Sequence, residues 1–312
     1  MNIVDRINEL KKEKNAVILA HNYQLPEVQD IADFTGDSLG LSIKAAHTTA
    51  DVIVFCGVYF MAETAKILSP QKTVLIPDPS SGCPMADMIT AKQLRELKAK
   101  HPHAKIMSYV NTPAEVKAES DFCCTSANAI EMLNNAFDEN DEIIFVPDKY
   151  LASYSCKQTG RKAIIWQGYC PSHIKILPED ILKQKKLHPQ AKVMAHPECT
   201  AGVLELSDVV VSTSGMLRFA KESDAKEFIV GTEVEMIYPL KKENPEKEFY
   251  PASKLAICPN MKKINLPKVL RSLETMTHAI ELPEDIIKRA TNAIENMITS
   301  GKNKNAPEPM KA

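Results

Sequence analysis

The sequence lacks the features of a membrane protein and of a nucleic-acid-binding protein. None of its apolar runs approaches the roughly 20 residues that a membrane-spanning helix needs. The N-terminal residues 1–14 are charged and helix-like, without the apolar core of a signal peptide. The formal net charge is only −2, and no basic stripe is present that would bind nucleic acid. We therefore expect a cytoplasmic protein that binds neither membranes nor nucleic acids.

Two common nucleotide-binding fingerprints are also absent. The chain contains no G-x-G-x-x-G motif and no G-x-x-x-x-G-K-[ST] motif. Its 44% apolar and 25% charged residues are the composition of a globular protein, which excludes a disordered or fibrous chain. The 312 residues allow two or three domains of ordinary size. If the fold has Rossmann-like layers, those layers alone would not imply a nucleotide ligand.

What the sequence does contain is a threefold internal repeat. Three Cys-Pro pairs begin at Cys83, Cys170 and Cys258, and the intervals between them are 87 and 88 residues. Equivalent positions of three related units can meet around a pseudo-threefold axis. The predicted units are residues 1–84, 85–172 and 173–259, with helices from residues 260–312 packing near the first unit.

Each predicted unit alternates helices and strands. An amphipathic helix precedes a short apolar strand, and two further strands follow, the last of which runs toward the cysteine. In the third unit we expect this last strand at residues 254–257. Strands that alternate with helices indicate an α/β fold with parallel sheets, whose ligands bind beyond the carboxyl ends of the strands. Two more helices are expected near 266–275 and 283–299, with Gly301 as a C-cap and a frayed tail after it.

The three cysteines that share the repeat spacing are candidate metal ligands. The proline after each one favours the first position of a helix, whose positive end would lower the thiol pKa and stabilise a thiolate. Zinc is the rival metal, but structural zinc normally takes four ligands, and the chain has no C-x₂₋₄-C pair. Three thiolates from distant loops fit a [4Fe–4S] cluster better. Its fourth iron would stay open and act as a Lewis acid in a dehydration.

The other five cysteines do not share this spacing, and a lone cysteine is more often a small buried hydrophobe than a ligand. We interpret four of them as structural and leave the fifth open, because it follows Glu198 near the expected site. The four are Cys56, Cys123, Cys124 and Cys156, and the fifth is Cys199.

Polar residues follow the first strand of each unit. The three segments are 21–23 (HNY), 109–111 (YVN) and 196–198 (HPE). A lone histidine after a strand is more often structural, but here three polar segments at equivalent positions would converge on one cavity. Histidine and glutamate are natural acid/base groups, and burial could raise the pKa of Glu198 toward neutrality.

Three hydroxyl residues also share the repeat spacing, each five residues after an aspartate. They have two interpretations: ordinary helix N-caps, or hydroxyls that act with helix amides to bind carboxylate or phosphate groups. Three anion sites would suit a small substrate with several negative charges. The hydroxyl residues are Ser38, Ser126 and Thr213, and the aspartates are Asp33, Asp121 and Asp208.

Nine stretches of the chain resemble the quinolinate synthase family. The resemblance runs from about residue 10 to about residue 275 and touches all three predicted units. The stretches are 20–24 (AHNYQ), 36–40 (GDSLG), 57–63 (GVYFMAE), 77–85 (PDPSSGCPM), 108–112 (SYVNT), 166–170 (WQGYC), 196–199 (HPEC), 212–215 (STSG) and 258–261 (CPNM).

The resemblance implies three αβα sandwich (Rossmann-like) domains around a central cavity, with one [4Fe–4S] cluster held by Cys83, Cys170 and Cys258. It implies that iminosuccinate and dihydroxyacetone phosphate condense to quinolinate, phosphate and two waters. An aspartate oxidase or dehydrogenase would supply the iminosuccinate. The implied substrate-binding residues are His21, Ser38, Tyr109, Val110, Asn111, Ser126, His173, His196, Pro197, Glu198 and Thr213. The implied catalytic residues are Glu198, Tyr23, His21 and His196. Some relatives carry a redox C-x-x-C pair; this chain has none, so we do not expect that form of regulation.

Two rival functions stay open at the level of sequence. A related fold could run another iron–sulfur dehydration, such as that of a small hydroxy acid. Alternatively, the chain could be a cluster carrier or an iron sensor. A carrier would need exposed ligands and no polar ring, whereas here polar residues recur at the same spacing as the cysteines.

Overall fold

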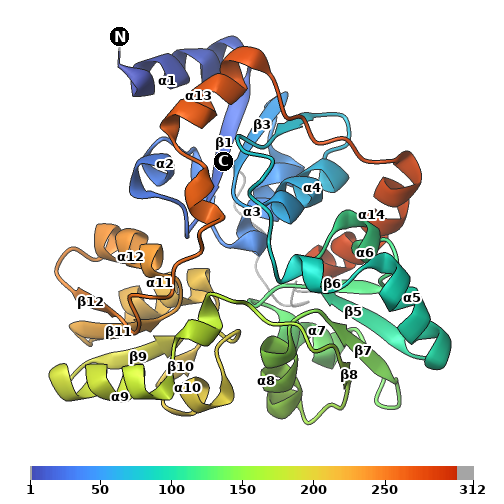
Figure 1. Ribbon diagram of the computed structural model, residues 1–312, viewed down its shortest axis with the longest axis vertical. Coiled ribbons are helices and arrows are strands. Elements are labelled where there is room, and N and C mark those ends of the chain that lie inside the picture. The colour runs from blue at the N-terminus through green and yellow to red at the C-terminus, as the bar shows by residue number, and fades with distance from the viewer. Residues whose placement is uncertain (1, 301–312) are drawn as a thin grey trace.

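The computed structural model describes residues 2–300, whose framework is three four-stranded parallel sheets that share one topology (Figure 1). In each sheet the first strand in sequence lies between the second and the third, and the fourth strand forms the outer edge. The first sheet has the order β2-β1-β3-β4, with β1 (Ala16–His21), β2 (Phe34–Gly36), β3 (Val52–Cys56) and β4 (Thr73–Leu75). The second has β5 (Lys105–Tyr109), β6 (Phe122–Cys124), β7 (Ile143–Val146) and β8 (Ile164–Ile165). The third has β9 (Lys192–Ala195), β10 (Val209–Val210), β11 (Glu227–Gly231) and β12 (Glu248–Pro251).

Helices cover both faces of each sheet, which is why the inner strands are continuous apolar runs. Every residue of β3 and β7 is buried, as expected for a parallel strand with both faces covered. Around the first sheet lie α1 (Ile3–Glu13), α2 (Pro26–Asp30), α3 (Ser38–His47), α4 (Tyr59–Leu68) and the 3₁₀ turn η1 (Ala86–Met88). The second has α5 (Ala91–Lys100), α6 (Ala114–Lys117), α7 (Ala129–Asn135), α8 (Lys149–Thr159) and η2 (His173–Lys175). The third has α9 (Pro178–Leu187), α10 (Ala201–Glu205), α11 (Thr213–Glu222), η3 (Val234–Met236), α12 (Ile237–Glu243) and η4 (Met261–Lys263).

The aspartates that share the repeat spacing fix the first strand of each sheet. Each uses Oδ2 to accept the backbone N–H of a residue near the start of that strand, at 2.7–2.8 Å. The pairs are Asp33 with Ile18, Asp121 with Ile106, and Asp208 with Val193. A strand held at its start in the same way in each sheet delivers its carboxyl end, and the polar segment after it, to an equivalent place.

The last strand of the third sheet lies earlier than we predicted. β12 pairs with β11 one residue to one, from Glu227 opposite Glu248 to Val230 opposite Pro251. Residues 254–257, our prediction, instead form the connection to Cys258, where Leu255 is 70% exposed. The apolar pair Leu255 and Ile257 resembled a buried strand, but the sheet edge is already occupied by β12. The short strands β2, β6 and β10 were not predicted either.

Two helices follow the third sheet and return to the first two (Figure 1). Helix α13 (Leu266–Thr275) packs on α1 and β3, whereas α14 (Glu284–Ser300) packs on α4 and on α6, α7 and β6 of the second. The boundaries 84/85 and 172/173 stay a prediction, and Gly301 and the tail lie outside the described residues. Within residues 2–300 no helix combines the length and apolar character that crossing a membrane requires.

Candidate active site

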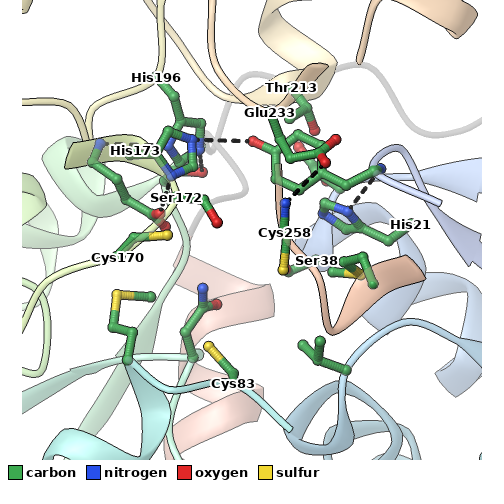
Figure 2. Close-up of a pocket in the computed structure, with 18 of the residues that line it drawn as sticks. His21, Ser38, Cys83, Cys170, Ser172, His173, His196, Thr213, Glu233 and Cys258 are labelled. Carbon is green, nitrogen blue, oxygen red and sulfur yellow. Dashed lines mark hydrogen bonds and ion pairs between the residues drawn. The ribbon is translucent and has the colours of Figure 1, made fainter. Parts of the chain in front are cut away.

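Side chains from all three sheets line one central cavity, in which the labelled cysteines, histidines and hydroxyl residues face a common space (Figure 2). Most of the predicted site residues are in this lining. They are His21, Tyr23, Ser38, Cys83, Tyr109, Asn111, Ser126, Cys170, His173, His196, Glu198, Thr213 and Cys258. Val110 and Pro197 are buried outside the lining, and so are four of the five other cysteines; the fifth, Cys156, is partly buried there.

The strands and helices explain this convergence. β1 ends at His21, β5 ends at Tyr109, and His196 directly follows β9, so three equivalent strand ends reach the cavity. Because the strands of each sheet are parallel, the carboxyl ends of neighbouring strands lie at one edge. The repeat spacing in the sequence therefore corresponds to a real geometric equivalence.

The three candidate metal ligands lie in the loops after β4, β8 and β12. Each is followed by a single 3₁₀ turn instead of the α-helix that we expected, because the residue after each turn has extended backbone. Burial raises the pKa of the Cys83 thiol to about 12 and raises the pKa values of Cys170 and Cys258. Backbone N–H groups of the turns lower these pKa values by less. Our prediction of a lowered thiol pKa was therefore wrong for the free thiols; a bound metal would deprotonate them.

The donors and their surroundings fit a metal–sulfur group. All three thiols are free and partly buried, and the same cavity is walled by apolar and thioether side chains. Soft sulfur donors favour iron–sulfur clusters, zinc or Cu(I) over magnesium or calcium. A second donor combination shares Cys170: its sulfur, a ring nitrogen of His173 and a carboxylate oxygen of Glu198 lie within 4.8 Å of one another. The cysteine trio therefore adjoins a buried carboxylate of the cavity, that of Glu198.

Glu198 is held by two polar side chains from different parts of the chain. The Tyr109 hydroxyl donates to its Oε1 at 2.7 Å, and His173 Nδ1 lies 2.8 Å from its Oε2. Burial alone would raise the pKa of Glu198. The imidazoles of His173 and His196 and these hydrogen bonds lower it by more, so the pKa lies well below its ordinary value. Our prediction that burial would bring this pKa toward neutrality was wrong, because it left out the partners.

Two imidazoles of the cavity, those of His21 and His196, carry no charge at neutral pH. Burial lowers the pKa of both His21 and His196 to about 3, aided by neighbouring imidazoles. His196 stacks on His173 with ring centroids 4.7 Å apart, and its Nε2 lies 3.1 Å from the Ser126 hydroxyl. The rings of His21 and His196 can exchange protons or accept hydrogen bonds, but they do not supply fixed positive charge.

A chain of polar groups leads from Glu198 to Tyr23. His173 contacts Glu198 through Nδ1 and lies 2.8 Å from the Thr232 hydroxyl through Nε2. The Thr232 hydroxyl is in turn 2.5 Å from the Tyr23 hydroxyl. Thr232 was missed by sequence reasoning, although its place directly after β11 was available as a signal. His173 Nδ1 makes no aligned hydrogen bond within the described residues, so the hydrogen-bonded part of this chain runs from His173 through Thr232 to Tyr23.

None of the three predicted hydroxyl residues is a helix N-cap, and Ser126 lies two residues before Asn128, the N-cap of α7. At the other two positions the preceding residue caps the helix: Asp37 accepts the Gly40 N–H at the start of α3, and Ser212 accepts the Gly215 N–H at the start of α11. Ser38 and Thr213 are therefore the first helical residues, and the N-cap interpretation is wrong for them. Their hydroxyls line the cavity beside the amino ends of two helices, where anions are favoured.

Several other lining residues were not predicted. Glu233 is fully buried and follows β11 by two residues, as Asp148 follows β7, so comparing the repeats could have found it. The apolar lining residues gave no signal that separates them from ordinary core residues. They are Val58, Phe60, Met61, Met85 and Met261.

A cavity that gathers thiols, a partnered carboxylate and neutral imidazoles at the strand ends of an α/β fold is typical of an enzyme and not of an exposed cluster carrier. The chain belongs to the quinolinate synthetase A protein family, whose model matches residues 5–299. It is 56% identical over 296 residues to quinolinate synthase 1 of Methanosarcina acetivorans, covering 95% of this chain and 97% of that one. It is 55% identical to a quinolinate synthase of Dehalococcoides mccartyi strain CBDB1, with the same coverage of both chains.

The family makes this chain an enzyme of NAD biosynthesis with quinolinate synthase function. The carrier and sensor alternatives are therefore excluded. One solved structure, E-1-hydroxy-2-methyl-but-2-enyl-4-diphosphate reductase from Plasmodium falciparum, aligns over 88% of this chain and 93% of its own. Its TM-score of 0.31 and 14% identity are too low to support an argument.

Proposed function

We propose that the enzyme condenses iminosuccinate with dihydroxyacetone phosphate to give quinolinate, phosphate and two waters, with one [4Fe–4S] cluster per chain. The observation that carries the proposal is the single cavity that brings Cys83, Cys170 and Cys258 beside the Glu198–His173 pair. When bound, the cluster would supply an iron without a thiolate ligand, a Lewis acid that assists the loss of hydroxide.

The hydroxyl residues at the helix starts would bind the negative groups of the substrates. Ser38 and Thr213 combine a hydroxyl with the backbone N–H groups of α3 and α11, and Ser126 lies beside His196. Iminosuccinate carries two carboxylates and the triose a phosphate, so three such positions match the charges to be held. Asn111 and Tyr109 line the same cavity.

Glu198 would move protons in the reaction. Its lowered pKa keeps it ionised, so it can accept the C–H proton of iminosuccinate and pass that proton to the imine nitrogen, which gives the nucleophilic enamine. In a later dehydration it can again take a proton from the substrate and deliver it to the departing hydroxyl, which leaves as water. His173, Thr232 and Tyr23 extend the path by which the proton can travel, and His21 and His196 stand beside it as neutral imidazoles.

The supply of iminosuccinate implies a functional partner. This imine hydrolyses in water, so we propose that an aspartate oxidase or dehydrogenase forms it close to where it is used. A cytoplasmic location and the absence of nucleic-acid partners stay predictions from the sequence.

The test is to purify the protein without oxygen, count iron and sulfide per chain, and assay quinolinate from both substrates. Cys170→Ala should lose the visible absorbance of the cluster and all activity. The matched control is Cys156→Ala on α8, outside the cavity, which should retain both. A full cluster in the Cys170 variant would contradict the ligand assignment, and wild-type protein without iron and sulfide would contradict the cofactor.

A further inference from the structure

The position two residues after the third strand of each sheet faces the loop that carries the cysteine. In all three sheets, the next residue donates its backbone N–H to the carbonyl two residues before the cysteine, at 2.8–3.0 Å. The donor and acceptor pairs are Tyr59 with Ser81, Lys149 with Gly168, and Val234 with Ala256. The residues at the facing position are Val58, Asp148 and Glu233, so the three cysteine loops have different neighbours.

Glu233 makes the fullest set of contacts to its cysteine loop. Its Oε1 accepts the backbone N–H of Cys258 at 3.0 Å, and its Oε2 accepts the N–H of Glu235 at 2.9 Å. Asp148 also lies near the N–H of Cys170, but one of its carboxyl oxygens has no hydrogen-bond partner among the described residues. Val58 offers no polar side chain. Among the three facing positions, only Glu233 is a carboxylate with both oxygens hydrogen-bonded within residues 2–300.

Lys262 extends this contact to another part of the cavity. Its Nζ lies 2.9 Å from Glu233 Oε1 and donates to the backbone carbonyl of Tyr23 at 2.5 Å. The Glu233 side chain is fully buried and that of Lys262 is 18% exposed. Removing either partner therefore leaves a charge in the protein interior without its counter-ion. A second contact runs beside it, from Gln24 Nε2 to the sulfur of Met261 at 3.5 Å.

We propose that Glu233 and Lys262 are positioning residues that couple the Cys258 loop to Tyr23. The pair sets the Cys258 backbone on one side and the Tyr23 backbone on the other, so the ligand loop and the proposed proton path keep one relative position. The role of this pair in catalysis rests on the proposed function; the mechanical coupling itself does not.

Hydrogen exchange of the backbone amides, followed by mass spectrometry, tests the coupling with or without a cluster. Glu233→Ala should speed exchange about tenfold in the peptide that contains Cys258, because its amide loses its acceptor. The same variant should also speed exchange around Tyr23, which Glu233 does not touch. Lys262→Met should produce the Tyr23 effect, and Lys262→Arg should restore it in part. Glu235→Gln is the control, because its carboxylate is 3.9 Å from the same ammonium and half-buried.

Exchange in β7 distinguishes local loosening from general unfolding and should be unchanged in every variant. If Glu233→Ala leaves the Tyr23 peptide at the wild-type rate, or if β7 loosens equally, the coupling is refuted. In anaerobically loaded protein, Lys262→Met should keep its iron and sulfide and lower kcat about tenfold with KM unchanged. If the variants show the exchange coupling but the wild-type protein binds no cluster, the proposed cofactor is refuted and the coupling still holds.

Discussion

Two glutamates buried to nearly the same degree behave in opposite ways. Glu198, at the central cavity, is 3% exposed, and Glu63, on α4 between the first and second sheets, is 6% exposed. The pKa of Glu198 lies well below its ordinary value. Burial raises the pKa of Glu63 to about 7, and the nearby charge of Lys117 only partly offsets this. Glu63 accepts one backbone N–H, that of Ala114 at 3.2 Å, whereas Glu198 has a hydroxyl and an imidazole.

The difference shows that partners, not depth, decide whether a buried carboxyl is charged. Glu198 is held as a carboxylate beside the hydroxyl of Tyr109 and the imidazole of His173, so at neutral pH it is free to accept a proton. Glu63 titrates near neutrality and fastens the start of α6, while Lys117 at the other end of α6 donates to the carbonyl of Thr112. Glu198 lies in the cavity, where it can take part in the reaction, and Glu63 stabilises the loop that follows Asn111.

The largest effect that separates the two should come from removing the charge of Glu198. Glu198→Gln keeps the shape and one acceptor, so we expect both substrates to bind while kcat falls by about 10² to 10⁴. Glu63→Gln is the matched control and should change kcat by less than about threefold, because Glu63 does not line the central cavity. Steady-state kinetics of both variants test this prediction. A Glu198 variant with the wild-type rate would show that Glu198 lines the cavity without taking part in proton transfer.

Replacing Glu63 should change the free energy of unfolding, not the rate of the reaction. Its folded pKa of about 7 lies above its ordinary value of 4.5, so its contribution to stability is complete below pH 4.5 and is lost as pH rises through 7. Glu63→Gln cannot titrate and should flatten the fall in unfolding free energy between pH 5 and pH 8 by about 1–3 kcal/mol. Urea unfolding at each pH measures this, and equal slopes in wild type and variant would contradict the assignment.

The smallest effect concerns a single hydrogen bond to Glu198. Tyr109→Phe removes one donor to the carboxylate and should therefore raise the pKa of Glu198 toward its ordinary value. We expect turnover to fall about tenfold and the acid limb of the rate profile to move to higher pH. Tyr154→Phe on α8 is the control, since that hydroxyl makes no hydrogen bond within the described part of the chain. An unmoved acid limb would show that Tyr109 does not control the ionisation of Glu198.

The repeat spacing was enough to predict the parallel α/β architecture and most of the cavity. Cys83, Cys170 and Cys258 could be grouped because a spacing of 87 or 88 residues carries geometric information once each unit folds alike. The spacing could not place β12, because an edge strand of mixed polarity such as residues 248–251 looks less like a strand than the apolar segment before Cys258. It also missed short edge strands such as β10, whose two residues leave no periodicity to detect.

Most of the residues named from the sequence line one cavity, but the sequence did not predict their ionisation. A sequence shows that Glu198 will be near the strand ends; it does not show that Tyr109 and His173 converge on its two oxygens from distant segments. Lys262 was missed for the same reason, since its two partners come from different sheets. Ionisation depends on distances of a few ångströms across the fold, and spacing along the chain does not contain them.

The return of the chain to the first sheet has a consequence for the order of synthesis. Ile280 donates to the carbonyl of Val74, and Ile76 donates to that of His278, so residues 278–280 cover the outer edge of β4 while α13 covers α1 (Figure 1). As the chain leaves the ribosome, the first sheet is made earliest, yet its edge and one helix face stay bare for some 200 residues. The part of the protein that is translated first is thus the part that is finished last, and a nascent chain stalled before α13 exposes a strand edge on which other chains can pair.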